Sequence, residues 1–344
     1  MAVAHVDAVV LTALPEEDAA VVRALGDCTD HPWQGQMLHA GRVGALTALA
    51  FPMGGMGNAS SAQAATLAIS IWNPAYLLLV GISAGIEEAG DDLRLGDVVV
   101  PDQIVGYERA KVRPHEVERR YEVVQPSWKL LQAARGLAPR EWALDVAASR
   151  PDGHGGRVVP CAHFGPVFSG EKIVADETTV PELRKAWPKA VGLEMEAFGA
   201  GIAAYRGHPE FLMVKAVSDF ADPAKGDDWH AYAAESAARF AVALLRNPAI
   251  QPEPERPQAT PVSGAPGFSG AVKIQFCRRL RDSWVELADF FEVPAHETAR
   301  FRPGNEPRDL WEWLDARGKL PLVPDVLGEV GRDDLARLMR DDRP

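Results

Sequence analysis

A proline-rich segment between residues 247 and 265 limits how this chain can fold. Its five prolines stand at positions 248, 252, 254, 257 and 261, among Gln, Glu, Thr and Ser residues. Because proline has a fixed φ and no backbone N–H, such a segment can neither continue a helix nor join the interior of a sheet. We therefore predict an extended linker over residues 247–265, between a domain at residues 1–246 and a second domain at residues 266–344.

The first domain alternates apolar runs with helix signals. Pro15 and the acids after it favour a helix start, and Asn58 or Ser60 is expected to cap an alanine-rich helix that ends near Trp72. Buried strands separated by helices predict an α/β fold with a parallel or mixed central β-sheet flanked by helices. The apolar runs that indicate strands lie at residues 6–14, 43–51, 75–80 and 95–100.

The second domain has apolar residues at helical spacing, as at Trp284, Leu287 and Phe290. This pattern predicts five or six short helices in a small all-α bundle. Prolines and glycines interrupt the pattern at positions 294, 303, 304, 318, 321 and 331.

Charge and cysteine content exclude several classes of protein. The formal net charge of −12 argues against a nucleic-acid partner, because such binding needs a basic surface. Cys28, Cys161 and Cys277 are far apart, so we expect neither a disulfide framework nor a zinc site. The sequence has no uncharged apolar run of membrane-spanning length and no basic region before its first apolar stretch. We therefore predict a cytoplasmic protein with no membrane partner.

The sequence also gives no sign of a metal or a cofactor. The phosphate-binding motif G-x-x-x-x-G-K-[ST] is absent. The glycine-rich stretch at 54–58 is not followed, before residue 87, by the acid that a dinucleotide site uses to bind ribose. We interpret His154, His163 and His230 as structural or surface residues, since their neighbours do not have metal-ligand spacing.

Carboxyl groups near the ends of expected strands are the candidates for catalysis. Asp219 follows an apolar run at 211–217, and Glu17 follows the first strand. Glu194 and Glu196 precede that run by about fifteen residues. The carboxyl ends of strands in an α/β fold face the ligand crevice, and two carboxyls in different environments suit acid–base chemistry on a sugar. A helix cap, a favourable charge at a helix N-terminus or a solvated surface would each explain such acids as well.

Six short motifs follow one another through the first domain. They are Leu11-Thr-Ala-Leu-Pro-Glu-Glu17, Gly81-Ile-Ser-Ala-Gly85, Leu95-Gly-Asp-Val-Val-Val-Pro101, Ser169-Gly-Glu-Lys-Ile-Val174, Leu193-Glu-Met-Glu-Ala197 and Val217-Ser-Asp219. In this order they resemble the nucleoside phosphorylase/nucleosidase superfamily, and most of all the 5′-methylthioadenosine/S-adenosylhomocysteine nucleosidases. The resemblance covers nearly all of residues 6–246 and implies a phosphorylase-like mixed central β-sheet.

The resemblance implies a role for each matched position. Glu17 would activate the attacking water, and Asp219, oriented by Ser218, would deliver a proton to the purine leaving group. Glu196 would hold the ribose hydroxyls, with Met195 against the sugar. The other implied contacts are Ser83 and Gly85 beneath the sugar, and Ile173 and Val174 at the base.

The implied chemistry sets an expectation for the two catalytic environments. Cleavage of an N-glycosidic bond builds oxocarbenium character on the ribose and negative charge on the departing base. We therefore expect burial to keep Asp219 protonated and a wetter setting to keep Glu17 ionised.

Water is the expected nucleophile. Phosphorylases of this superfamily hold phosphate with arginines, and one is expected just before the Ser83 position, where this chain has Leu79 and Val80. We therefore favour hydrolysis over phosphorolysis, which stays as an alternative.

Four basic residues depart from the nucleosidase pattern and leave the substrate open. Lys172, Arg109, Lys111 and Arg113 are either exposed surface charges or groups that hold the phosphates of a nucleotide such as AMP or ATP. The predicted substrate is accordingly a purine nucleoside or nucleotide.

The second domain resembles the death-fold effector-associated domains of bacterial conflict and defence proteins. The motifs that carry this resemblance, over residues 268–340, are Leu280-Arg-Asp-Ser-Trp284, Leu287-Ala-Asp289, Arg300-Phe301-x-x-Gly304-Asn-Glu306, Trp311-Glu-Trp313-Leu314 and Gly331-Arg-Asp-Asp-Leu335. The resemblance implies a death-like adaptor that pairs with a like domain on a partner protein.

Together these features predict a purine nucleosidase effector that is recruited through its C-terminal adaptor, with antiviral defence as its setting. The first resemblance also implies a homo-oligomer. The alternative is a nucleoside-binding signalling module without catalysis, which would not require Glu17, Glu196 and Asp219.

Overall fold

The computed structural model describes residues 5–86, 93–114, 116–153, 159–207, 209–221, 226–251, 268–298, 301–302, 304–315 and 317–342. The chain divides into two units, Met1–Glu253 and Pro254–Pro344. Residues 252–265 of the predicted linker, and residues 266–267 of the predicted second domain, lie outside the described residues. Residues 247–251, also assigned to that linker, pack on the first unit, where Ile250 is fully buried. The predicted limits of linker and domains stay a prediction.

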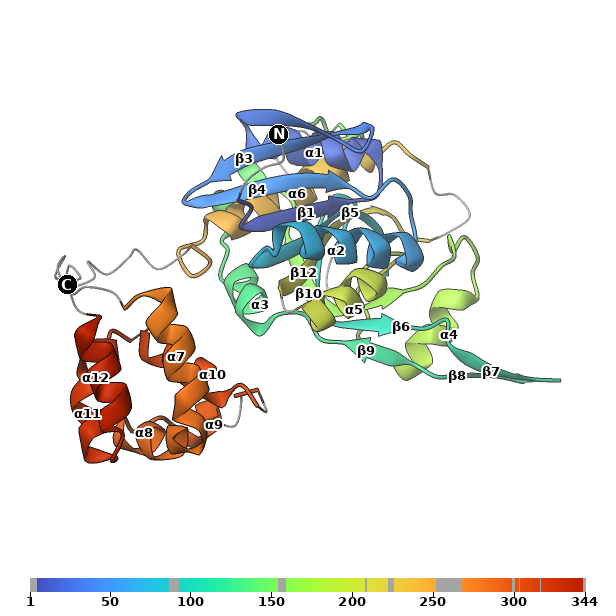
Figure 1. Ribbon diagram of the computed structural model, residues 1–344. Coiled ribbons are helices and arrows are strands. Elements are labelled where there is room, and N and C mark those ends of the chain that lie inside the picture. The colour runs from blue at the N-terminus through green and yellow to red at the C-terminus, as the bar shows by residue number, and fades with distance from the viewer. Residues whose placement is uncertain are drawn as a thin grey trace. The chain divides into compact units, whose positions relative to one another are not determined.

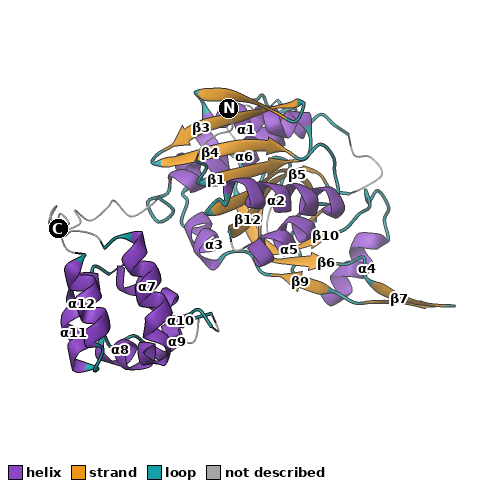
Figure 2. Ribbon diagram, in the orientation of Figure 1, coloured by secondary structure: helices purple, strands orange, loops and turns teal. Residues whose placement is uncertain are grey.

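A mixed β-sheet forms the centre of the first unit (Figures 1 and 2). Its strands run in the order β11-β10-β6-β12-β5-β1-β4-β3-β2, and β9 pairs with β6. Because β11 pairs with β5 as well as β10, the strands β5, β12, β6, β10 and β11 form a closed ring. The strand bounds are β1 Ala8–Thr12, β2 Cys28–Trp33, β3 Gln36–Val43, β4 Leu46–Pro52, β5 Tyr76–Gly85, β6 Val98–Gly106, β9 Glu122–Val124, β10 Ala162–Ser169, β11 Gly192–Glu194 and β12 Glu210–Asp219.

Helices cover both faces of this sheet. Helices α1 (Pro15–Leu25), α3 (Trp128–Arg135) and α6 (His230–Arg246) share one apolar core with it, and α2 (Asn58–Trp72) and α5 (Ala197–Gly207) share the other. Along β5, Leu78 and Val80 enter the first core, whereas Leu77 and Leu79 enter the second. Strands buried on both faces need apolar residues at every position, which explains the continuous apolar runs of the sequence. The predicted α/β fold with a mixed central sheet is confirmed.

Two smaller features complete the first unit. Strands β7 (Ala110–Arg113) and β8 (Glu116–Arg119) form a hairpin that extends away from the central sheet (Figure 1). Helix α4 (Thr179–Ala186) lies between β10 and β11 in the chain. Short 3₁₀ turns follow α3 at Pro139–Glu141 and Ala143–Asp145.

Glycine explains three of the boundaries that differ from those that the sequence predicts. Gly44, with φ +62°, turns the chain between β3 and β4, so β4 starts at Leu46. Gly96, with φ +89°, delays the start of β6 to Val98. The residue that precedes α2 as its N-cap is Gly57, with φ +96°, rather than Asn58 or Ser60. These positive φ values suit glycine and are rare for other residues.

The second unit is an all-α bundle, as predicted. Phe276, Leu280, Leu310 and Trp311 belong to its single core, and the rings of Phe276 and Trp311 meet at 4.9 Å. The helices of its described residues are α7 Gly270–Leu280, α8 Trp284–Phe290, α9 Ala295–Thr298, α10 Glu306–Asp315, α11 Val323–Glu329 and α12 Asp333–Asp341, with 3₁₀ turns at Arg281–Ser283 and Leu320–Leu322. Within the described parts of both units, each helix is too short or too polar to traverse a bilayer.

Candidate active site

A pocket opens where several strands of the first unit end. Its walls come from the segment after β1, the end of β5, the turn between β11 and α5, the end of β12 and the loop after β10. This location, at the carboxyl ends of strands, is typical of ligand sites in α/β folds. The lining residues are Ala13, Leu14, Glu17, Met56, Ile82, Ser83, Ala84, Lys172, Ile173, Val174, Leu193, Glu194, Met195, Glu196, Lys215, Ser218, Asp219 and His230.

Glu17 lies in the first turn of α1, and its carboxylate is buried in the pocket wall. One oxygen accepts hydrogen bonds from the backbone N–H groups of Ala13 (2.7 Å) and Leu14 (2.9 Å). The other accepts one from the N–H of Ile82 on β5 (2.8 Å). Glu17 therefore caps its own helix and also reaches the central sheet. It has both the capping role and the place in the ligand crevice that the sequence allowed.

Gly81 makes the approach of Glu17 to β5 feasible. A Cβ atom at position 81 would lie 2.1 Å from Oε1 of Glu17, which is far inside van der Waals contact. A glycine is required here because the carboxylate occupies the space of a side chain.

Glu194 and Glu196 have separate roles at the end of β11. Glu194 accepts hydrogen bonds from the N–H groups of Glu196 (2.9 Å) and Ala197 (3.0 Å), so its carboxylate stabilises the N-terminus of α5. Glu196 accepts from the N–H of Gly57 (2.9 Å) and lines the pocket. Both carboxylates are buried, which contradicts the interpretation of them as solvated surface groups.

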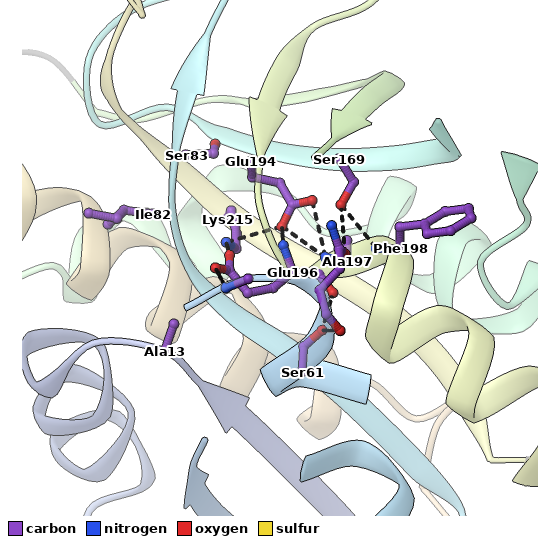
Figure 3. Close-up of polar contacts among 12 residues, drawn as sticks. Ala13, Ser61, Ile82, Ser83, Ser169, Glu194, Glu196, Ala197, Phe198 and Lys215 are labelled. Atoms are coloured by element: carbon purple, nitrogen blue, oxygen red, sulfur yellow. Dashed lines mark hydrogen bonds and ion pairs between the residues drawn. The ribbon is translucent and has the colours of Figure 1, made fainter. Parts of the chain in front are cut away.

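Lys215 connects these two carboxylates from the middle of β12 (Figure 3). Its Nζ lies 2.5 Å from Oε2 of Glu196 and 3.2 Å from Oε2 of Glu194. Although burial opposes ionisation of Glu196, Lys215 and the Gly57 N–H hold its pKa below the usual range. Glu196, Glu194 and Glu17 raise the pKa of Lys215 against the effect of its burial, so it is an ammonium group.

Asp219 ends β12 beside Ser218. Its Oδ2 accepts a hydrogen bond from the Ser218 hydroxyl (3.0 Å) and its Oδ1 accepts one from the N–H of Ala221 (2.8 Å). The side chain is half-buried, whereas Glu17 is only 2% exposed. Burial raises the pKa of Glu17, while Lys215 and three backbone N–H groups oppose that rise. The expectation of a buried acid and a wetter base was therefore wrong: the base lies deeper than the acid.

The structure brings nine of the ten predicted site residues into this one pocket. Met195 and Val174 line it, as does Ile173, which is 61% exposed. Ser83 lines it as well, and among the described residues its buried hydroxyl has no hydrogen-bond partner. Gly85 does not line the pocket: it pairs with Gly192 of β11, and a Cβ there would lie 2.8 Å from Val217. Close packing of the strands therefore leaves no room for a side chain at position 85.

Of the four basic residues considered for phosphate, Lys172 alone lines the pocket. Its Nζ lies 2.7 Å from Glu108, and its side chain is 68% exposed. Arg109 pairs with Glu122 and Arg113 pairs with Glu118, both away from the pocket lining.

Sequence reasoning missed Lys215 and misjudged His230. A lysine in an otherwise apolar strand was a usable signal, because a buried ammonium needs a carboxylate partner. His230, at the start of α6, lines the pocket with its Nδ1 3.2 Å from Glu16. His163 has the structural role that was predicted, against Asp97 at 3.0 Å, and His154 lies outside the described residues. Within the described residues, no cluster of His, Cys, Asp and Glu is suited to a metal ion.

Both units match known families. The phosphorylase superfamily model matches residues 7–246, and that of bacterial death-like domain 3 matches residues 270–342. The chain is 27% identical over 263 residues to the ATP nucleosidase Cap17 of Escherichia coli (strain KTE188), covering 69% of this chain and 50% of that protein. It is 28% identical over 182 residues to the death domain-containing ATP nucleosidase of Amphimedon queenslandica, covering 50% and 34%. The chain thus spans about half or less of these relatives.

Solved structures show the same fold. The 5′-methylthioadenosine/S-adenosylhomocysteine nucleosidase of Neisseria meningitidis superposes with a TM-score of 0.55 at 19% identity, over 70% of this chain and 98% of that one. The S-adenosylhomocysteine nucleosidase of Streptococcus pyogenes gives 0.57 at 17% identity, over 72% and 99%. With a family model matched over residues 7–246 and this fold, the chain belongs to the phosphorylase superfamily.

Proposed function

We propose that the first unit hydrolyses the N-glycosidic bond of a purine nucleoside or nucleotide. The observation that carries the proposal is the meeting of Glu17, Glu196 and Asp219 in one pocket, although they are far apart in the sequence. Relatives named as ATP nucleosidases and as 5′-methylthioadenosine/S-adenosylhomocysteine nucleosidases support the same reaction.

Each group has a task in the proposed reaction. Glu17 takes a proton from water as the water oxygen bonds to C1′ of the ribose. The C1′–N bond breaks with its electron pair on the base, and Asp219 supplies the proton that neutralises this charge. Glu196 accepts hydrogen bonds from the ribose hydroxyls and, as an anion, stabilises the oxocarbenium character of the sugar. A positioned acid or base contributes about 10²–10⁴-fold in rate.

The charges of the pocket support water over phosphate as the nucleophile. Lys215, the buried cation of the lining, is engaged by Glu194 and Glu196. Glu17 and Glu196, which act as anions in the proposed reaction, belong to the lining together with Glu194 and Asp219. An acidic interior disfavours a phosphate dianion beside the sugar, because like charges repel more strongly out of water.

The substrate class is narrowed by the relatives and by one lysine. Two of the matched proteins are named for ATP, so we place ATP first among the nucleotides to be tested. Lys172, at the exposed side of the pocket, is the candidate contact for its phosphates.

We further propose that the second unit recruits this activity. A death-like domain suggests a protein partner that carries a like domain, and antiviral defence in the cytoplasm is the setting that we propose. A homo-oligomer of the first unit is also proposed, on the family resemblance alone.

Base release tests the proposal. The chain is incubated without phosphate with adenosine, 5′-methylthioadenosine, S-adenosylhomocysteine, AMP and ATP, and free base is measured by chromatography. We expect release of adenine from at least one of them. Release only after phosphate is added would assign a phosphorylase. No release, with or without a partner, combined with retained nucleoside binding would favour the signalling module.

A further inference from the structure

Lys215 occupies a position that the strand pattern reserves for an apolar side chain. Side chains alternate along β12, and Lys215 shares a face with Met213 and Val217, which are fully buried. A buried ammonium is tolerated only when carboxylates compensate for the water that it loses. A lysine at this position therefore indicates a role for its charge, in addition to packing.

Two carboxylates pair with this ammonium, and a third, that of Glu17, acts on it from the neighbouring strand. Glu196 and Glu194 lie within ion-pair distance of its Nζ, at 2.5 and 3.2 Å. On the neighbouring strand β5, Lys215 is in register with Gly81, the glycine that the Glu17 carboxylate contacts. Lys215 thus links the proposed base to the proposed ribose-binding acid.

The other charged groups described near Glu17 are engaged with partners of their own. Glu16 and Asp18 flank it on α1; Glu16 faces His230 of α6, and Asp18 accepts from Thr12. Glu194 and Glu196, from β11 and the turn after it, face Lys215, and Asp219 of β12 is engaged by Ser218. Among the described residues, the cation that lowers the pKa of Glu17 is Lys215.

We propose that Lys215 is a positioning residue that keeps Glu17 ionised near neutral pH and holds Glu196 in place for the ribose. The inference rests on the proposed function, because it assigns Glu17 the part of the base. Burial favours the neutral form of Glu17, and the positive charge of Lys215 opposes that preference. A lysine that served only to fill the core would leave the ionisation of Glu17 unchanged.

Two substitutions separate charge from packing. Lys215→Gln removes the charge but can still donate a hydrogen bond to Glu196, and Lys215→Arg keeps the charge. For each variant, kcat/KM is measured from pH 4.5 to 9 with adenosine and with ATP. We expect Lys215→Gln to move the acid limb of the profile to higher pH, with about tenfold loss of rate per pH unit of displacement below that limb. Lys215→Arg should keep the limb where the wild type has it.

A second variant keeps the test informative if Lys215→Gln does not fold. Circular dichroism checks each protein, and if Lys215→Gln does not fold, the double variant Glu194→Gln/Lys215→Gln replaces it, since it removes one unpaired carboxylate together with the ammonium. Glu194 caps α5, and the proposed reaction assigns it no step. The double variant should show the same displaced limb.

The outcomes are distinct. An unchanged limb in a folded variant without the Lys215 charge, or a displaced limb in Lys215→Arg, would overturn the inference while the proposed function stands. A wild-type chain that releases no base from any substrate removes the proposed function, and the inference falls with it.

Discussion

At the scale of single residues, opposing influences act on the ionisation of Glu17. Burial raises the pKa of its carboxyl group, whereas Lys215 and three backbone N–H groups favour the charged form. The net direction is upward from the ordinary value of 4.5. A base is strongest at a given pH when its pKa lies close to that pH, so this shift suits general base catalysis.

A pH profile tests this balance. Because Glu17 must be ionised to accept a proton, and because its pKa is raised, we expect kcat/KM to fall on the acid side with a limb above pH 4.5. Glu17→Gln should lower kcat by about 10²–10⁴-fold and abolish that limb. The control is Glu16→Gln, one residue away and 39% exposed, which should leave the limb in place. Equal loss in both variants would contradict the role given to Glu17.

Asp219 is the second residue whose removal should separate catalysis from binding. Asp219→Asn keeps the size of the side chain but cannot deliver the proton, so we expect base release to fall by about 10²–10⁴-fold. Nucleoside binding, measured by calorimetry, should persist. Asp102→Asn, at a half-buried acid on β6 outside the pocket lining, is the control and should keep full activity. Normal turnover by Asp219→Asn would assign the proton to another group.

At the scale of elements, the site depends on close approaches between helix ends and strands. Asn58, at the start of α2, accepts from the N–H of Gly199 (2.8 Å) on α5 and donates to the carbonyl of Gly170 (3.1 Å). Glu196, just ahead of α5, accepts from the N–H of Gly57 ahead of α2. The two helix N-termini are thus fixed to each other, and this holds the proposed ribose contact in position.

Gly81 offers a test of such an approach. In Gly81→Ala the new Cβ would lie 2.1 Å from Oε1 of Glu17, so the carboxylate must move. We expect kcat to fall at least about tenfold and the free energy of unfolding to fall by about 1–3 kcal/mol, as for overpacking. In the control Gly136→Ala the nearest atoms are at ordinary distances of 3.5 and 3.6 Å, and the change should stay within about 0.5 kcal/mol. Urea unfolding and initial rates measure both, and an unaffected Gly81→Ala would contradict the fit described above.

At the scale of the whole molecule, the first unit extends beyond its last helix. The carbonyl of Ile250 accepts a hydrogen bond from the Tyr76 hydroxyl (2.8 Å), and Gln251 accepts one from the N–H of Ala45 (2.6 Å). Ile250 itself is fully buried in the core beneath α6. The segment 247–251 is therefore part of what stabilises this unit.

Two truncations test that conclusion. A chain that ends at Arg246 loses the Ile250 side chain from the core, so its free energy of unfolding should be about 2–5 kcal/mol below that of a chain that ends at Gln251. Urea unfolding of both proteins measures the difference. Equal stability would show that residues 247–251 contribute nothing.

The longer truncation also tests the division of tasks. Because the lining residues of the pocket all precede residue 231, residues 1–251 should release base at a rate within about twofold of the full chain in the absence of a partner. Loss of activity in this stable fragment would show that the second unit takes part in catalysis.

The strands β1, β4, β5, β6 and β12, the helices α1 and α2, and the helical second unit could be predicted because apolar periodicity and turn residues are local signals. The strands β2, β3 and β10 and the helices α3 to α6 were not predicted. The starts of β4 and β6 were predicted too early, because Gly44 and Gly96 have positive φ values. The path of the chain decides where φ is positive, and a glycine in the sequence does not by itself show that a turn occurs there. The short strand β11 and the hairpin β7–β8 carry too few residues for a periodic signal. Lys215 was overlooked because its partners are set by strand pairing and by a turn twenty residues away.

The sequence by itself determined the two folding units, the alternation of strands and helices, and the set of carboxyl groups available for chemistry. These follow from local hydrophobicity, from proline and glycine, and from motif order. The tertiary structure decided which acids meet, that Glu17 is buried more deeply than Asp219, and that an ammonium from β12 lies among three of them. Ionisation in a buried site depends on the distances between groups and on the water excluded around them, and only the folded chain sets those distances.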